Sequence, residues 1–332
     1  MNIALRQAHH GKYLIFAALT LLLLTSFPGW VTAQVRLEIY PFESINITGD
    51  AFLRGETGKP VMLAGELRIP KPGNDKLPAV ILMHPSSGIT PAHFDRWAQE
   101  LNSLGIAVFL LDSGAGRGIS RFPVDLPNLF YLQLLVDAYR ALDLLAKHPR
   151  IDPNRIAVMG FSMGATPAVY SSSERFWKKY GSPTVQFAAH IGVYGSCNTV
   201  FRDQEKVTGK PIRLFKATPD DFGPIEPCRE YVSQLKQAGA DVMMTEYPGV
   251  THQYDYPNFK EVIKLPQAPV RRNCSLKEGE QGQVIDVATG KPFDPSVSCT
   301  EKGSTVVYNE AATVATTTAV KDFLTTTFGL KR

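Results

Sequence analysis

The sequence predicts an α/β protein built on a mostly parallel central sheet with helices on both faces. Short segments that are apolar at every residue recur along the chain, and segments with apolar residues three and four positions apart alternate with them. Fully apolar segments are typical of central strands that helices bury on both faces. We expect one domain over residues 34–332, because α/β chains of about 300 residues commonly form a single core.

The elements follow from this alternation in chain order. The expected strands are residues 61–69, 79–83, 106–111, 156–159, 187–194, 212–216 and 241–247. The expected helices are residues 94–104, 131–145, 228–238 and 309–324. The polar residues 34–60 receive no element, and residues 265–307, rich in Gly, Pro and charge, are expected to form an insertion in the domain.

The first 33 residues have the pattern of a secretory signal peptide. Arg6 and Lys12 precede the apolar residues 13–24, and the small-residue site 31–33 follows. The apolar stretch is shorter than the roughly 20 residues that span a bilayer, so a permanent transmembrane helix is the weaker interpretation. The sequence predicts export to the periplasm or the medium, with the mature chain starting near Gln34.

The charge balance predicts no nucleic-acid partner. The formal charge of +4 falls to +2 when residues 1–33 leave, because they contain Arg6 and Lys12 and no acid. No dense cluster of Lys and Arg is present in the sequence. The partner that we expect is a small-molecule substrate, and no stable membrane span is expected after signal cleavage.

The segment from Gly160 to Gly164 is a G-x-S-x-G motif between a predicted strand and a helical stretch. On a tight strand-to-helix turn the two glycines avoid contacts that a Cβ would make, and the serine Oγ projects above the sheet. The helix that follows directs its N-terminal N–H groups and positive dipole end at the reacting centre. We predict that Ser162 is a nucleophile.

A serine hydroxyl needs a base within hydrogen-bond reach, and that base needs an orienting carboxylate. The histidines after residue 33 are His84, His93, His148, His190 and His252. His252 is the predicted base because it lies in a loop just beyond the strand 241–247, at the C-terminal edge of the sheet. The others have the patterns of a strand end, a helix start, a surface residue and a buried strand residue.

Two adjacent aspartates, Asp220 and Asp221, follow the predicted strand 212–216. Either carboxylate is able to accept the Nδ1–H of the base, and the other is then expected to be a turn residue bonded to nearby backbone. The order along the chain is nucleophile, acid, base, which is the order found in α/β-hydrolases.

A tetrahedral oxyanion needs two hydrogen-bond donors. The backbone N–H of Met163, directly after the nucleophile, is the expected first donor. The second should come from the loop after the strand 79–83, where Pro85 has no N–H to donate. Ser86 is our choice for this donor, with Ser87 as the alternative, and the competing interpretation is a turn that only ends the strand.

Several motifs together resemble the dienelactone hydrolase family of the α/β-hydrolase superfamily, in its secreted, serine-containing relatives. They are Gly65-Glu66-Leu67, Val80, Leu82 and His84, the G-x-S-x-G, Asp220-Asp221-x-x-Pro224, Cys228 and Pro248-Gly249-x-x-His252. The resemblance implies an α/β-hydrolase fold and hydrolysis of a carboxylic ester or lactone through an acyl-enzyme. In that family the acid is the aspartate four residues before the proline, which corresponds to Asp220.

Two departures from that family limit what the resemblance implies about the substrate. Dienelactone hydrolases proper use a cysteine nucleophile, whereas this chain has Ser162. The loop after the first central strand has Pro85 at what looks like the position of their glutamate. Dienelactone itself is therefore not the expected substrate, and the acyl and alcohol preference stays open.

Two other functions compete with an esterase. A serine peptidase of the prolyl-oligopeptidase type shares the fold and motif order, but such enzymes carry a large additional domain, for which about 128 residues between Gln34 and Ser162 leave no room. A ligand carrier with a retained hydrolase fold and no turnover is the other alternative. Carriers of that kind usually lose one residue of the triad, and Ser162, Asp220 and His252 are all present.

All four cysteines follow the predicted signal peptide, and four thiols permit three pairings. Cys274 and Cys299 bracket a Gly-Lys-Pro turn, whereas Cys197 and Cys228 follow two neighbouring strands at one sheet edge. We predict these two disulfides, with four buried free thiols as the alternative. No metal-ligand spacing is present, so neither a metal nor a cofactor is expected.

A few residues near the expected mouth of the site are candidates for shaping a pocket. They are Arg117, Arg121, Phe122, Phe130 and Tyr194. One hypothesis is that the two arginines favour an acidic substrate. The alternative is that all five are ordinary packing or surface residues.

Overall fold

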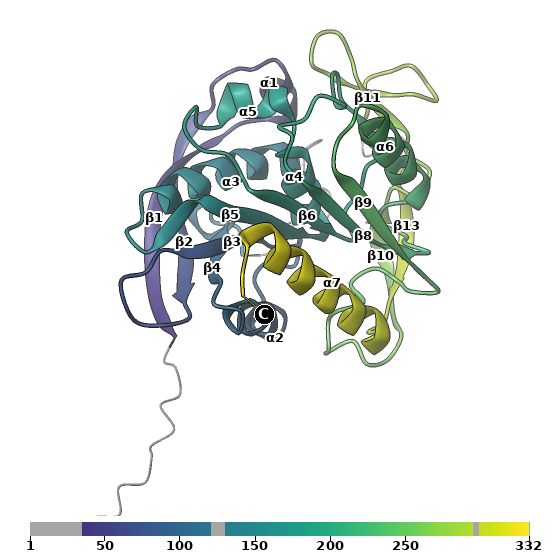
Figure 1. Ribbon diagram of the computed structural model, residues 1–332. Coiled ribbons are helices and arrows are strands. Elements are labelled where there is room, and N and C mark those ends of the chain that lie inside the picture. The colour runs from purple at the N-terminus through teal and green to yellow at the C-terminus, as the bar shows by residue number, and fades with distance from the viewer. Residues whose placement is uncertain (1–34, 121–129, 295–298, 332) are drawn as a thin grey trace, which may run out of the picture. The chain divides into compact units, whose positions relative to one another are not determined.

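The computed structural model describes residues 35–120, 130–294 and 299–331 (Figure 1). Its centre is an eight-stranded sheet with the order β1-β2-β4-β3-β5-β6-β8-β9. The strands are β1 (Arg36–Asn46), β2 (Lys59–Ile69), β3 (Leu77–Met83), β4 (Ala107–Asp112), β5 (Ile151–Phe161), β6 (Ala189–Val193), β8 (Ile212–Thr218) and β9 (Val242–Pro248). The six strands from β4 to β9 in this order are parallel, and β1 and β2 are antiparallel to their neighbours. The prediction of a mostly parallel sheet is confirmed.

Helices cover both faces of this sheet and divide the core in two. On one face lie α2 (Pro91–Asn102) and α7 (Glu310–Phe328), and on the other lie α3 (Phe130–Ala146), α4 (Ala165–Tyr170) and α6 (Ile225–Gln237). Successive side chains of a strand point to opposite faces, so Ala79 and Ile81 of β3 join one cluster while Val80 and Leu82 join the other. This double burial explains why β3 is apolar at every residue.

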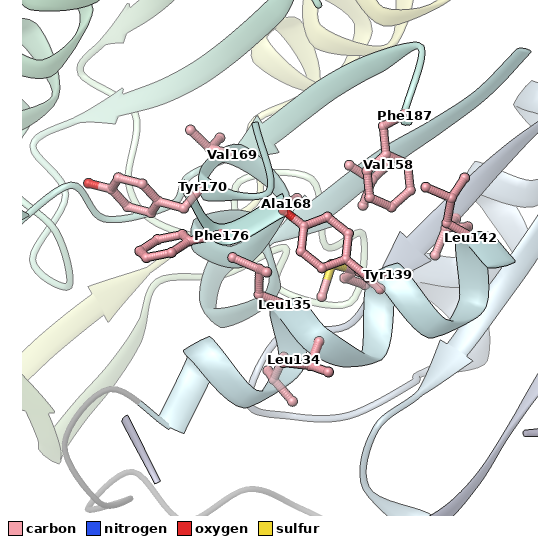
Figure 2. Close-up of a cluster of buried hydrophobic side chains, with 14 of the residues drawn as sticks. Leu134, Leu135, Tyr139, Leu142, Val158, Ala168, Val169, Tyr170, Phe176 and Phe187 are labelled. Atoms are coloured by element: carbon pink, nitrogen blue, oxygen red, sulfur yellow. The ribbon is translucent and has the colours of Figure 1, made fainter. Parts of the chain in front are cut away.

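The larger cluster shows how the helices pack against the sheet. Figure 2 shows Leu135 and Tyr139 of α3 against Val158 of β5 and Ala168 of α4. Tyr139 is fully buried, and its hydroxyl donates to the carbonyl of Ser171 at 2.8 Å. The phenol is therefore satisfied within the core, as a buried polar group must be.

The N-terminal part of the domain is more regular than the sequence analysis expected. Residues 34–60 contain β1 and the short helix α1 (Gly49–Leu53). β1 pairs with β2 along its whole length, from Arg36 opposite Ile69 to Asn46 opposite Lys59. β1 is an edge strand in which Leu37 and Ile39 are exposed and polar Ser44 is buried, so its sequence lacks the continuous apolar signal of the central strands.

The insertion also contains strands that the sequence analysis did not assign. β10 (Ile263–Val270) pairs with β13 (Glu301–Val306), while β11 (Leu276–Glu278) joins β12 (Val284–Asp286) and β7 (Thr199–Val200). Strands of two or three residues give too little sequence pattern to detect, and partners distant in the chain define them. Disulfides Cys197–Cys228 and Cys274–Cys299 are present, the same two pairs that the sequence led us to expect.

None of the helices in the described ranges is both long and apolar enough to cross a membrane. The predicted signal peptide, residues 1–33, lies outside the described residues.

Candidate active site

The backbone at Ser162 has the strained turn that the G-x-S-x-G motif predicts. β5 ends at Phe161, and Ser162 has φ of 51°, a left-handed conformation that costs a residue with a Cβ roughly 1 to 3 kcal/mol. A Cβ on Gly160 would lie 2.0 Å from the carbonyl oxygen of Gly164, and one on Gly164 would lie 2.6 Å from that of Met83. Both glycines are therefore required for this turn, which places the partly exposed Ser162 at the carboxyl edge of the sheet.

His252 meets Ser162 from the loop after β9. Its Nε2 lies 2.8 Å from the Ser162 Oγ. Positive φ angles at Gly249 (73°) and Gln253 (56°) turn the chain on either side of the histidine. The same loop is also held by β13, since His252 forms a parallel β-bridge with Val306 of that strand. The chain therefore returns from the insertion directly beside the imidazole.

Asp220, from the loop after β8, lies behind the imidazole. His252 Nδ1 is 3.0 Å from both Asp220 carboxylate oxygens, and the backbone N–H groups of Phe222 and Gly223 donate to Oδ1 at 3.0 and 3.3 Å. Since the carboxylate only accepts, Nδ1 carries the imidazole proton and Nε2 presents a lone pair to Ser162.

The electrostatic environment keeps Asp220 ionised. Burial by itself raises the pKa of this carboxyl, but the nearby charges of His252 and Lys216, with the hydrogen bonds from His252 and Phe222, lower the pKa to about 2. Asp220 is therefore ionised at neutral pH.

Asp221, the other candidate acid, is directed away from the histidine. Its carboxylate accepts the backbone N–H of Thr305 at 3.1 Å and pairs with Arg272 at 3.3 Å. The structure therefore brings Asp220, and not Asp221, to His252. Asp221 instead connects the loop after β8 to the insertion.

The predicted oxyanion donors lie on two neighbouring segments. Met163 is the second residue of the 3₁₀ turn η2 (Ser162–Gly164), and Ser86 lies in a turn closed by the Gly88 N–H donating to the Pro85 carbonyl at 3.0 Å. The loop after β3 passes close to the turn at Ser162, as the short distances from a Cβ on Gly164 to the carbonyls of Met83 and His84 show. The donor roles themselves stay predictions.

His84 has a structural place in this loop. Burial lowers its pKa, so the ring is neutral: Nδ1–H donates to the Pro85 carbonyl at 2.8 Å, and Nε2 accepts the Ser113 N–H at 3.3 Å. His84 thus joins the loop after β3 to the loop after β4.

Aromatic side chains enclose the imidazole. The ring centroids of Phe222 and Tyr194 lie 4.6 and 5.0 Å from that of His252. Tyr194 is fully buried, has φ of 44°, and donates its hydroxyl to Asp255 Oδ1 at 2.7 Å. Of the five suggested pocket residues, Tyr194 is therefore in contact with the proposed base.

Asp255 is a buried carboxylate that the sequence analysis missed. Its Oδ2 lies 2.8 Å from both His93 Nε2 and Trp97 Nε1, and 3.1 Å from Arg96. Burial raises the pKa of Asp255, but His93 and Arg96, with the hydrogen bonds, lower it to about 2. The only sequence signal is an acid three residues after His252, which identifies no partner.

Arg117 gives no support to the acidic-substrate hypothesis. Arg117 is buried, and its guanidinium pairs bidentately with Asp137 at 2.7 and 2.9 Å and donates to Asn46 Oδ1 and the carbonyls of Ile45 and Ser113. All five of its N–H groups are therefore occupied within the protein. Arg121 and Phe122 lie outside the described residues.

Phe130 begins α3 and packs against the larger core cluster. Among the described residues, no three His, Cys, Asp or Glu side chains are grouped as metal ligands would be.

The architecture is that of the α/β-hydrolase superfamily: a mostly parallel sheet with the strand-to-helix turn of Ser162 at its carboxyl edge. The model of the dienelactone hydrolase family matches residues 64–262, and the chain belongs to this family of hydrolases. No curated protein matches the chain.

Two solved structures illustrate the shared fold. One is a dienelactone hydrolase-like promiscuous phosphotriesterase from metagenomic libraries, with 14% identity and a TM-score of 0.54, covering 87% of this chain and 98% of that one. The other is m3DLH, with 15% identity and a TM-score of 0.56, covering 87% of this chain and 97% of that one.

Proposed function

We propose that this protein is a serine esterase that cleaves a carboxylic ester or lactone through an acyl-enzyme intermediate. The observation that carries the proposal is the continuous hydrogen-bonded chain from Ser162 through His252 to Asp220, at a strained turn above the sheet edge. Nucleophile, base and orienting acid in this geometry are what acyl transfer by a serine requires.

In the proposed reaction, His252 takes the hydroxyl proton as Ser162 Oγ attacks the carbonyl carbon. Backbone N–H groups of Met163 and Ser86 stabilise the negative oxygen of the tetrahedral intermediate. The C–O bond to the alcohol breaks, and His252 returns the proton to that oxygen. In a lactone, the alcohol stays attached to the acyl group. His252 then takes a proton from a water as the water oxygen attacks the acyl carbon. The bond from that carbon to Ser162 Oγ breaks, His252 returns the proton to Oγ, and the acid leaves.

The test is turnover of p-nitrophenyl esters of increasing acyl length by the wild type and two variants. We expect Ser162→Ala and His252→Ala each to lower kcat/KM by about three to six orders of magnitude with folded circular dichroism spectra, because a triad acts as a unit. A fluorophosphonate should label the wild type and not Ser162→Ala.

Labelling at another residue, or equal turnover by Ser162→Ala, would contradict the proposed nucleophile. Peptide cleavage with no ester turnover would favour the peptidase alternative. A wild type that neither turns over nor is labelled would favour the ligand carrier.

We also propose that the protein is exported and that its signal peptide ends at Ala33. The two disulfides support this, since such bonds persist in oxidising compartments. Mass spectrometry of the protein secreted or exported by its host should find a chain beginning near Gln34. An intact Met1 in the exported protein would contradict the cleavage site.

A further inference from the structure

A buried lysine lies immediately behind the proposed acid. Lys216 is in β8, four residues before Asp220, and is 1% exposed. Its neighbours Phe215 and Ala217 are apolar core residues, so a cation here must be compensated by specific partners.

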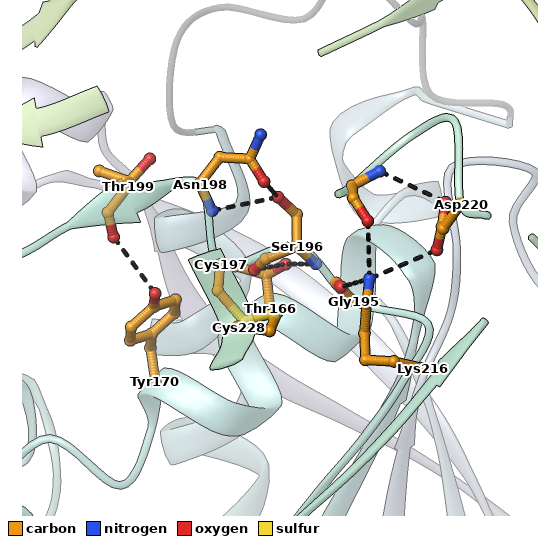
Figure 3. Close-up of a disulfide and its surroundings, with 11 residues drawn as sticks. Thr166, Tyr170, Gly195, Ser196, Cys197, Asn198, Thr199, Lys216, Asp220 and Cys228 are labelled. Atoms are coloured by element: carbon orange, nitrogen blue, oxygen red, sulfur yellow. Dashed lines mark hydrogen bonds and ion pairs between the residues drawn. A yellow bond between two sulfur atoms is a disulfide. The ribbon is translucent and has the colours of Figure 1, made fainter. Parts of the chain in front are cut away.

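The ammonium group of Lys216 has an acceptor for each of its three N–H bonds. It lies 2.6 Å from the carbonyl oxygen of Gly195, 2.9 Å from that of Gly223 and 3.4 Å from Asp220 Oδ2, as Figure 3 shows for Gly195 and Asp220. Gly195 follows β6, and Gly223 belongs to the loop after β8 that carries Asp220, which we call the acid loop. Lys216 therefore fixes the acid loop against the end of the neighbouring strand.

We propose that Lys216 is a positioning residue for hydrolysis: it holds the Asp220 carboxylate ionised and facing His252, and so acts on Ser162 through the acid and the base. This inference rests on the proposed function of the same site. Within the described residues, Lys216 makes no hydrogen bond to Ser162 or His252. Its effect must therefore pass through Asp220.

The charge of Lys216 is what distinguishes it from a merely structural donor. The N–H groups of Phe222 and Gly223 already orient Oδ1, whereas Lys216 supplies the positive charge at Oδ2. A cation within 4 to 6 Å typically shifts a carboxylate by roughly 1 to 3 pKa units. Loss of this charge stabilises the protonated form of the Asp220–His252 pair, so the acid limb of the pH profile should move to higher pH.

Other ionisable groups near the pair are engaged elsewhere. The Tyr194 hydroxyl donates to Asp255, the Tyr254 hydroxyl pairs with Thr316 at 2.8 Å, and Asp221 pairs with Arg272. Asp255 is itself compensated by the residues of α2 described above. Lys216 is therefore the cation in direct contact with the acid, apart from the imidazole when that is protonated.

Three variants separate charge, hydrogen bonding and general stability. Lys216→Gln keeps an N–H donor for a carbonyl but removes the charge, and Lys216→Met removes both. Arg150→Met is the matched control, because Arg150 is also buried and donates to the carbonyls of Lys71 and Asp75, at the opposite end of β5 from Ser162.

Ester hydrolysis should respond to charge and not to generic destabilisation. We expect Lys216→Gln and Lys216→Met to lower kcat at pH 7 by about 10- to 100-fold, with KM changed less than about threefold, and to move the acid limb up by about one pH unit. Arg150→Met should keep the wild-type profile. In an Asp220→Asn background, Lys216→Gln should change kcat less than about twofold, because the residue through which it acts is gone.

A measurement without substrate separates this inference from the proposed function. The downfield ¹H resonance of His252 Nδ1–H reports the Asp220–His252 pair directly, and its titration should move to higher pH in Lys216→Gln whether or not the protein hydrolyses any ester. If Lys216→Met does not fold, Lys216→Gln still provides both readouts. A wild-type kinetic and NMR pH dependence in Lys216→Gln would overturn the inference. If the wild type shows no ester turnover that depends on Ser162, while the His252 titration still moves in Lys216→Gln, the proposed function is overturned and this inference stands.

Discussion

At the scale of single residues, neighbouring side chains with the same chemistry have separate tasks because the backbone directs them to different partners. Asp220 and Asp221 are adjacent, yet the first bonds to His252 and the second to Arg272 and Thr305. Composition and spacing alone leave both open as the acid. The geometry favours Asp220 for orienting the imidazole.

Asp220→Asn should therefore impair turnover far more than Asp221→Asn does. An asparagine at 220 is able to donate to Nδ1 and stabilise the wrong tautomer of His252, and the loss of kcat should be of the order of 10³ to 10⁴. We expect Asp221→Asn to lower kcat less than tenfold, because it affects only the anchor to the insertion. Steady-state kinetics of the two variants provide the test. Equal losses, or a larger loss for Asp221→Asn, would move the acid to position 221.

At the scale of elements, the insertion is part of the support for the proposed base. β13 forms the bridge to His252, and the Val307 N–H donates to Thr251 Oγ1 at 3.0 Å. The Cys274–Cys299 disulfide closes the loop that precedes β13. Loosening this segment should therefore affect both stability and the site.

The paired variant Cys274→Ser with Cys299→Ser should lower the free energy of unfolding by about 3 to 4 kcal/mol on the chain-entropy model. We also expect a changed preference between short and long acyl esters, because the insertion lies beside His252. Urea unfolding and the ester panel measure the two effects. Cys197→Ser with Cys228→Ser is the matched control for loss of a disulfide. If the Cys274→Ser, Cys299→Ser variant keeps the wild-type acyl preference, the insertion stabilises the fold and has no part in substrate choice.

At the scale of the whole molecule, two buried carboxylates lie on either side of the His252 loop and hold separate elements together. Asp220 connects β8 to the loop after β9, while Asp255 joins that loop to α2 and to the end of β6. Each has a pKa lowered to about 2 in the folded protein against 3.8 for an ordinary aspartate. Their ionised forms therefore stabilise the fold.

This predicts acid sensitivity between about pH 4 and pH 2. A carboxylate whose pKa is lower in the folded protein stabilises the fold fully above the pKa of the unfolded chain. It loses this stabilisation as the pH falls through the pKa of the folded protein. Each of the two aspartates should therefore contribute roughly 2 kcal/mol to the free energy of unfolding. Urea unfolding from pH 6 to pH 2.5 should show the decline. Asp255→Asn should reduce this decline, at a cost of about 3 kcal/mol or more at pH 6, because buried His93 and half-buried Arg96 lose the carboxylate that compensates them. The exposed Asp322→Asn is the control. A wild-type stability that is constant from pH 4 to pH 2.5 would contradict the prediction.

The sequence by itself determined what local patterns encode. Fully apolar segments such as β3 and β4 indicated central parallel strands, and the glycines around Ser162 indicated a strand-to-helix turn, because both signals lie within a few residues. The chain order of a candidate nucleophile, acid and base could also be predicted, although the residue pattern left Asp220 and Asp221 both open as the acid.

Tertiary structure alone decided the features that depend on partners distant in the chain. β1 and β11 exist through pairing with β2 and β7, and Arg117 faces Asp137 rather than the site. The roles of Lys216 and Asp255 could not be read from sequence either, since a charge is stable in a core only where the fold surrounds it with donors and opposite charges. These donors and opposite charges come from segments distant in the chain, so no local sequence pattern predicts them.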